Sequence, residues 1–187
     1  RSAGSNTDID AFVSISGGLS LMGEPSPDIP TKPALVVAAD KDKVVAADKS
    51  SALYKALATE KYWVEIANAG HNSFTDSCPS ILARGGLESM RPLLGALVDL
   101  AQDGCTEGMT DPLLVQSVLN HYTTAFFLTY LGVQDARASL TSDIASVLSG
   151  ISTFEAKPAS SGAGSSFSRR AYARTMPRAK APAGSSA

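Results

Sequence analysis

Short apolar blocks alternate with an amphipathic segment in the first third of the chain, and this pattern predicts a βαβ unit. The apolar blocks, each typical of a strand, lie at residues 11–15, 34–39 and 62–66. The run ALVVAA at 34–39 is apolar on both faces, as in a parallel strand that is covered on two sides. Between the second and third blocks, the spacing of apolar residues predicts a helix over 47–59, capped by Asp48 or Ser50. Because such crossovers are parallel and right-handed, the loops that leave the strands share one edge of the sheet.

Helical patterns follow a loop at residues 68–79. The predicted helices cover residues 90–102, 112–131 and, with a weaker pattern, 136–148. Pro112 suits a helix start and Gly132 suits a stop. From Lys157 onward the chain is composed mainly of Ser, Ala, Gly, Pro and Arg without periodicity. We therefore expect an α/β domain over residues 1–156 and a disordered tail over 157–187.

The composition narrows the class of protein further. A length of 187 residues suits one domain. The net charge of -2 argues against nucleic acid or an anionic membrane as the main partner. No apolar run reaches the roughly 18 residues of a membrane helix, so we expect no membrane span. The first residues lack both an initiator Met and the apolar core of a signal peptide, which favours a fragment or a processed product.

Two cysteines, Cys78 and Cys105, leave two alternatives open. They fit one disulfide, or they fit two unrelated thiols. Both positions are expected in loops, where a disulfide could hold down the loop that follows His71. A disulfide would imply an oxidising compartment, such as that of a secreted protein.

Candidate catalytic residues follow the second and third predicted strands directly. In an open α/β sheet, ligands bind beyond the carboxyl ends of the strands. Asp40 and Asp42 lie there after the strand at 34–39, and His71 lies there after the strand at 62–66. A carboxylate that orients an imidazole is the pairing with which serine hydrolases deprotonate their nucleophile.

Two stretches resemble α/β-hydrolases. PALVVAADKDKVVAADKSSALYKAL resembles their penultimate strand, acid loop and helix, and VEIANAGHNSFTD resembles their last strand and histidine loop. The resemblance, close over residues 8–76, implies a partial α/β-hydrolase fold with Asp42 as the acid and His71 as the catalytic base. Asp42 is preferred over Asp40 because Val44-Val45-Ala46 stands where the family has a Val or Ala-Pro pair after its acid. Asp40 is then a cap or a loop anchor.

The family's nucleophile motif, Gly-x-Ser-x-Gly, is absent from the sequence. The nearest approach surrounds Ser20, but it is one residue too long and is followed by prolines. AFVSISGG is similar to the strand that follows the nucleophile helix, so the resemblance implies a C-terminal half whose N-terminal half is missing. The strand at 11–15 would then be an exposed edge that needs this partner.

The resemblance implies a serine-type ester hydrolase of the lipase, carboxylesterase or polyester-hydrolase kind. Its substrate would be a small-molecule, lipid or polymer ester, and it would need no cofactor. We expect no metal, since no metal-ligand spacing is present. Tyr62 and Trp63 are expected to pack against covering helices. The aromatic residues around His121 in the helix at 112–131 are expected to pack in the core and on the substrate side, without a catalytic role for His121. Phe74 is expected to border an acyl pocket or anchor a loop. The alternative is a noncatalytic or truncated chain of this type, which binds a partner or is inactive alone.

Overall fold

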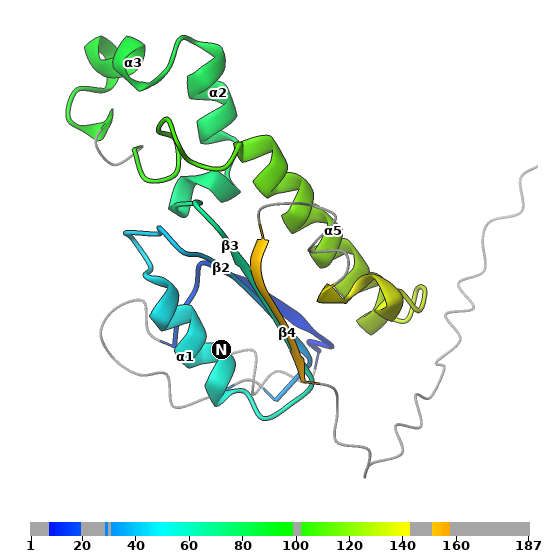
Figure 1. Cartoon of the computed structure of the whole chain (residues 1–187). Helices are drawn as coiled ribbons and strands as arrows, with labels where there is room; N and C mark the ends of the chain where they lie inside the picture. Colours follow the sequence, from blue (N-terminus) through cyan, green and yellow to red (C-terminus); the bar gives the residue numbers. More distant parts are fainter. Residues whose placement is uncertain (1–7, 20–28, 30, 99–101, 143–150, 158–187) are drawn as a thin grey trace, which may run out of the picture.

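Four strands form one mixed sheet in the order β1-β2-β3-β4. The computed structural model describes residues 8–19, 29, 31–98, 102–142 and 151–157. The strands are β1 Phe12–Ile15, β2 Ala34–Ala39, β3 Lys61–Ile66 and β4 Ile151–Lys157. The first three are parallel, as predicted, and β4 runs antiparallel to β3 (Figure 1). The chain is thus a mixed α/β fold.

The helices α1 Ala47–Ala56 and α5 Pro112–Tyr130 cover opposite faces of this sheet (Figure 1). The structure also describes α2 Ser77–Ala83 and α3 Leu87–Leu94, with 3₁₀ turns η1 His71–Phe74 and η2 Arg137–Ser139. Leu53 and Leu57 pack on the face of the sheet that carries Val36, whereas α5 packs on the opposite face. All six residues of β2 are buried, which explains its uninterrupted apolar sequence. Among the helices that the structure describes, none is long and apolar enough to cross a membrane.

Aromatic side chains of β3 join the two helical layers to the sheet. Tyr62 contacts Phe126 and Tyr130 of α5, with ring centroids 6.1 and 6.3 Å away. Trp63, its neighbour in β3, lies 5.7 Å from the ring of Tyr54 in α1. Successive residues of a strand face opposite sides of a sheet, so each ring reaches a different layer. The expectation that Tyr62 and Trp63 pack against covering helices is confirmed.

Several predicted helix boundaries are wrong. Neither Asp48 nor Ser50 caps α1, because Ala46 holds the cap position and makes no side-chain bond there. Ser50 lies inside the helix, and its hydroxyl donates to the carbonyl oxygen of Gly17 (2.7 Å). The helix α1 also ends at Ala56 and not at 59. By contrast, α5 begins at Pro112 and is followed by Gly132 with φ 69°, as predicted.

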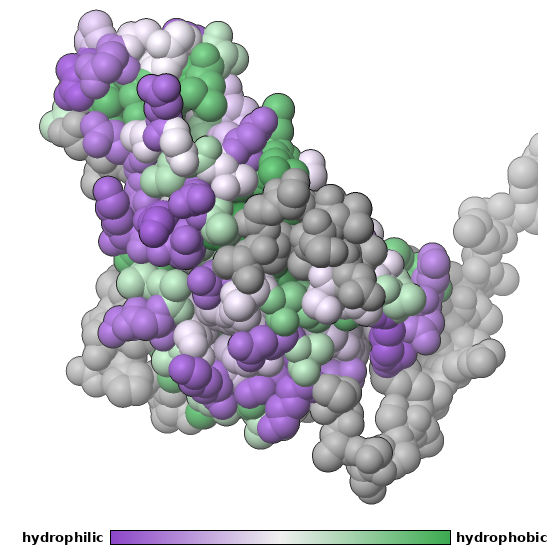
Figure 2. Space-filling view, in the orientation of Figure 1, coloured by the Kyte–Doolittle hydropathy of each residue, from purple (hydrophilic) through white to green (hydrophobic). Residues whose placement is uncertain are grey.

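The region around the predicted helix at 90–102 also differs from expectation. The loop expected at 68–79 contains η1 and the start of α2, and α3 spans Leu87–Leu94. Gly95 follows α3 with φ 54°, a conformation that stops a helix. Figure 1 shows α2 and α3 extending beyond the edge of the sheet where β3 ends. Leu82 and Leu93 are exposed on this arm. Figure 2 shows hydrophobic surface on the same arm, at the top of the view.

The strand β4 was not predicted. It pairs with β3 along residues 151–157, so it passes the expected domain boundary at 156. Of the helix expected at 136–148, the structure describes only the turn η2 and the residues up to 142, and the remainder lies outside the described residues. The predicted tail after Lys157 also lies outside them. An edge strand needs only one apolar face, which makes its pattern weak.

Glu65 in β3 predicts a pH-dependent stability. Partial burial, followed by the charges of Asp40 and Glu155, raises its pKa above the ordinary 4.5. A raised folded-state pKa stabilises the fold fully below pH 4.5, and this contribution is lost as the pH rises through the folded value. Glu65→Gln should therefore increase the free energy of unfolding at pH 7, and the gain should vanish below pH 4.5.

Urea denaturation of the wild type and the variant at both pH values measures this effect. The same change at Glu107, whose side chain is exposed, serves as the control and should alter neither curve. A Glu65→Gln variant that is less stable than the wild type at pH 7 would contradict the expectation.

Candidate active site

The loops after β2 and β3 lie side by side because the two strands end at the same level. Ala39 and Ile66, their last residues, are partners in the sheet register. The backbone of the two loops continues this pairing, since the amide of Lys41 donates to the carbonyl of Ala69 (3.0 Å). A turn at Asn68, with φ 51°, directs the second loop back across the strand end. The two loops are therefore held together by main-chain contacts before any side chain is considered.

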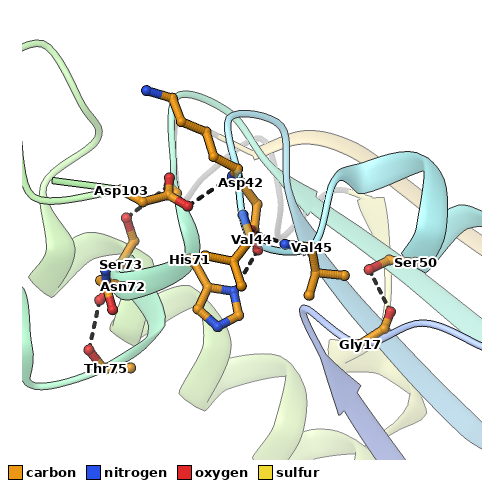
Figure 3. A network of polar contacts seen from close by, with 12 residues as sticks. Gly17, Asp42, Val44, Val45, Ser50, His71, Asn72, Ser73, Thr75 and Asp103 are labelled. Carbon is orange, nitrogen blue, oxygen red and sulfur yellow. Dashed lines mark hydrogen bonds and ion pairs between the residues drawn. The ribbon is translucent and has the colours of Figure 1, made fainter. Parts of the chain in front are cut away.

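Asp42 occupies the first of these loops with its side chain wholly buried (0% exposed). Its Oδ1 accepts hydrogen bonds from the amides of Val44 (2.8 Å) and Val45 (2.7 Å). Its Oδ2 lies 2.9 Å from Nδ1 of His71 (Figure 3). The two backbone donors fix the plane of the carboxylate and leave one oxygen directed at the imidazole. The structure thus brings together the two residues that the sequence singled out.

His71 is the first residue of η1, and about a third of its side chain (34%) is exposed. Nδ1 faces Asp42, so the neutral ring that donates this hydrogen bond carries its lone pair on Nε2. Among the residues that the structure describes, Nε2 has no hydrogen-bond partner. A histidine in this state can take a proton from a nearby hydroxyl, and a buried carboxylate at Nδ1 stabilises the imidazolium that results.

Asp40 does not join this pair. Its Oδ2 lies 3.9 Å from the ammonium of Lys41, and its Oδ1 is buried without a hydrogen-bond partner in the described part of the chain. Its amide donates to Ile66 (3.2 Å), which anchors the start of the loop to β3. This geometry favours Asp42 as the acid and is consistent with the interpretation of Asp40 as a loop anchor.

A third segment, Asp103 to Cys105, lies against both loops. Sequence reasoning considered Cys105 but missed Asp103. Asp103 is buried, and its Oδ2 accepts from the amide of Lys43 (2.8 Å). The next residue but one, Cys105, forms a disulfide with Cys78 of α2, which decides between the two alternatives for the cysteines. Asp103 follows no predicted strand. The one signal in the sequence that could have identified it is its position two residues before Cys105.

Of the remaining candidates, His121 and Phe74 lie in packed surroundings within the described structure. Nε2 of His121 lies 3.0 Å from the carbonyl oxygen of Ser139, and its ring contacts Tyr122 edge-on, which agrees with a packing role. Phe74 packs against the core cluster under α5, as a loop anchor would. Ser20 lies outside the described residues. Within the described part, no group of His, Cys, Asp and Glu side chains could hold a metal ion.

A cavity of about 520 Å³ lies beside the acid loop. It is lined by Asp40, Lys41, Asp42, Lys43, Asn68, Glu107, Gly108 and Met109. Asp42 lines it, whereas His71 does not. No model of a protein family matches this chain, and no curated protein matches it either, so its function has to be argued from the geometry of Asp42 and His71.

Proposed function

We propose that this chain provides the acid and the histidine of a serine-type ester hydrolase with a partial α/β-hydrolase fold. One observation carries the proposal: the buried Asp42 orients His71 through Nδ1 and leaves Nε2 accessible at the carboxyl ends of the parallel strands β2 and β3. The resemblance of the two loops to those of α/β-hydrolases supports the same function. The substrate would be a small-molecule, lipid or polymer ester.

The chemistry follows from the positions of the two ring nitrogens. Nε2 of His71 removes the proton of a serine hydroxyl as the serine oxygen attacks the ester carbonyl. The imidazolium then donates this proton to the departing alcohol, which leaves an acyl-enzyme. Nε2 next accepts a proton from water as the water oxygen attacks the acyl carbonyl. The bond between the acyl carbon and the serine oxygen then breaks, the serine oxygen takes the proton back from the imidazolium, and the carboxylic acid leaves. Asp42 holds the ring in place and stabilises its charged form throughout.

The serine itself would come from a segment preceding this sequence. In support, β1 pairs only with β2 among the described strands, so the other edge of β1 is free to receive a further strand. A strand in that position would end at the same edge of the sheet as β2 and β3. A nucleophile at its carboxyl end would therefore approach the side of the sheet where Nε2 of His71 is accessible.

Labelling with a fluorophosphonate tests the proposal. The longer open reading frame that contains this chain should be labelled at one serine upstream of residue 1, because an activated serine reacts with this probe. His71→Ala should abolish the labelling. His121→Gln, a change to the other histidine of these 187 residues, should leave it unchanged.

The chain of 187 residues alone should not hydrolyse a p-nitrophenyl ester. Hydrolysis by the chain alone that His71→Ala abolishes would place the nucleophile within this sequence and contradict its proposed origin. An unlabelled longer protein would favour a noncatalytic chain that binds a partner.

A further inference from the structure

Asp103 contacts both of the loops that carry the Asp42–His71 pair. Its side-chain Oδ2 accepts a hydrogen bond from the amide of Lys43, the residue after Asp42 (2.8 Å). Its main-chain carbonyl accepts one from the amide of Asn72, the residue after His71 (2.9 Å). Figure 3 shows Asp103 beside both loops. One residue thus fixes the neighbour of the acid and the neighbour of the base.

The contact between this segment and the histidine loop is too close to allow adjustment. A Cβ added to Gly70 would lie 2.3 Å from Oδ1 of Asp103 and 2.4 Å from the amide nitrogen of Gly104. Gly104 has φ 101°, and a Cβ there would lie 2.5 Å from Oγ of Ser73. That hydroxyl accepts from the amide of Gly70 (3.1 Å) and donates to the carbonyl of Gly104 (3.1 Å). Backbone therefore packs directly on backbone, and a shift of Asp103 would move His71.

The burial of the Asp103 carboxylate also has a cost in the free energy of folding. The residue is only 6% exposed, and Oδ1 has no hydrogen-bond partner among the described residues. A buried carboxylate with an unpaired oxygen opposes folding unless its other contacts compensate. Within the described part of the chain, the hydrogen bonds that Asp103 accepts come from the two loops that carry Asp42 and His71.

We propose that Asp103 is a positioning residue, which sets the distance between Asp42 and His71 by holding the two loops in register. The proposal rests on the proposed function for its catalytic meaning, but the geometry it concerns can be measured without any reaction. Two variants separate its parts. Asp103→Ala removes the acceptor for Lys43, whereas Asp103→Asn keeps an oxygen that can accept from Lys43 and removes the charge.

Nitrogen-15 NMR of the two histidine rings in the full chain provides the measurement. The wild type should show a deshielded Nδ1 proton on His71, because this proton lies in the hydrogen bond to Asp42. The signal is assigned to His71 by its persistence in the His121→Gln variant. Asp103→Ala should abolish this signal, and Asp103→Asn should retain it. In the longer protein, Asp103→Ala should lower kcat about 10²-fold with KM little changed, as a displacement of about 1 Å does.

Asp111→Ala is the matched control. It also removes a carboxylate that accepts a backbone hydrogen bond, here from Leu113 (2.9 Å) at the start of α5. It should lower the melting temperature without changing the signal of His71.

An Asp103→Ala variant that keeps the signal, or an Asp111→Ala variant that loses it equally, would overturn the proposal. If Asp103→Ala does not fold, loss of the signal in a folded Asp103→Asn variant overturns it. The two proposals can fail separately. If the signal of His71 responds as expected but a fluorophosphonate does not label the longer protein, the proposed function is refuted and the positioning role of Asp103 stands.

Discussion

Asp42→Asn is expected to lower the kcat for ester hydrolysis by about 10⁴-fold, the loss that this change causes when the acid of a catalytic triad becomes an amide. The amide oxygen can still accept from Val44 and Val45, so its nitrogen would face Nδ1 of His71. That nitrogen is a donor, and it would favour the tautomer that carries its proton on Nε2. The histidine could then no longer accept the serine proton. Steady-state kinetics of the longer protein, together with its melting temperature, measure the effect.

Asp40→Asn is the matched control, because it makes the same change two residues away on the same loop. Asp40 lies near Lys41 and makes no described contact with His71. The kcat of the Asp40→Asn variant should therefore stay close to that of the wild type. If Asp40→Asn lost activity and Asp42→Asn kept it, the two aspartates would have been assigned in the wrong order. Equal small effects would instead contradict the proposed chemistry.

The relation between Asp42 and His71 could be predicted because it depends on strand topology. Two parallel strands joined by a helix place their carboxyl ends at one edge, and the register of Ala39 with Ile66 makes those ends level. The apolar pattern of the strands was enough to locate both ends. That Asp42, and not Asp40, reaches the imidazole depends on the turn formed by the amides of Val44 and Val45. For that detail, the family resemblance was the guide.

Asp103 and β4 could not be predicted because their roles depend on long-range contacts. Asp103 is 60 positions from Lys43, and no local pattern marks a carboxylate that will accept from a distant amide. β4 pairs with β3 across more than 80 residues, and it lies at an edge where the constraint on its sequence is weak. The arm of α2 and α3 was misplaced for a local reason. Pro92 lies inside α3, and Gly95, with φ 54°, ends the helix earlier than the apolar residues suggest.

Removing the disulfide between Cys78 and Cys105 should have the largest effect on stability. The bond closes a loop with a sequence separation of 27, and loop-closure entropy for a loop of that length is worth roughly 3.5 kcal/mol. Both cysteines are buried in a small cluster with Ile81, so alanine replaces them without burying a new polar group. A Cys78→Ala, Cys105→Ala double variant should therefore melt roughly 10 °C lower than the wild type. Thermal denaturation without reductant measures the difference.

The disulfide also connects this loss of stability to the site. Cys105 follows Gly104, which packs against the histidine loop, so freeing Cys105 removes one support of Asp103. We expect the Nδ1 proton of His71 to exchange faster with solvent in the double variant. Wild-type protein treated with dithiothreitol should approach the variant in both measurements, whereas Leu82→Ala, an exposed change on α2, should alter neither. Equal melting temperatures for the wild type and the double variant, with and without reductant, would show that the bond does not constrain this region.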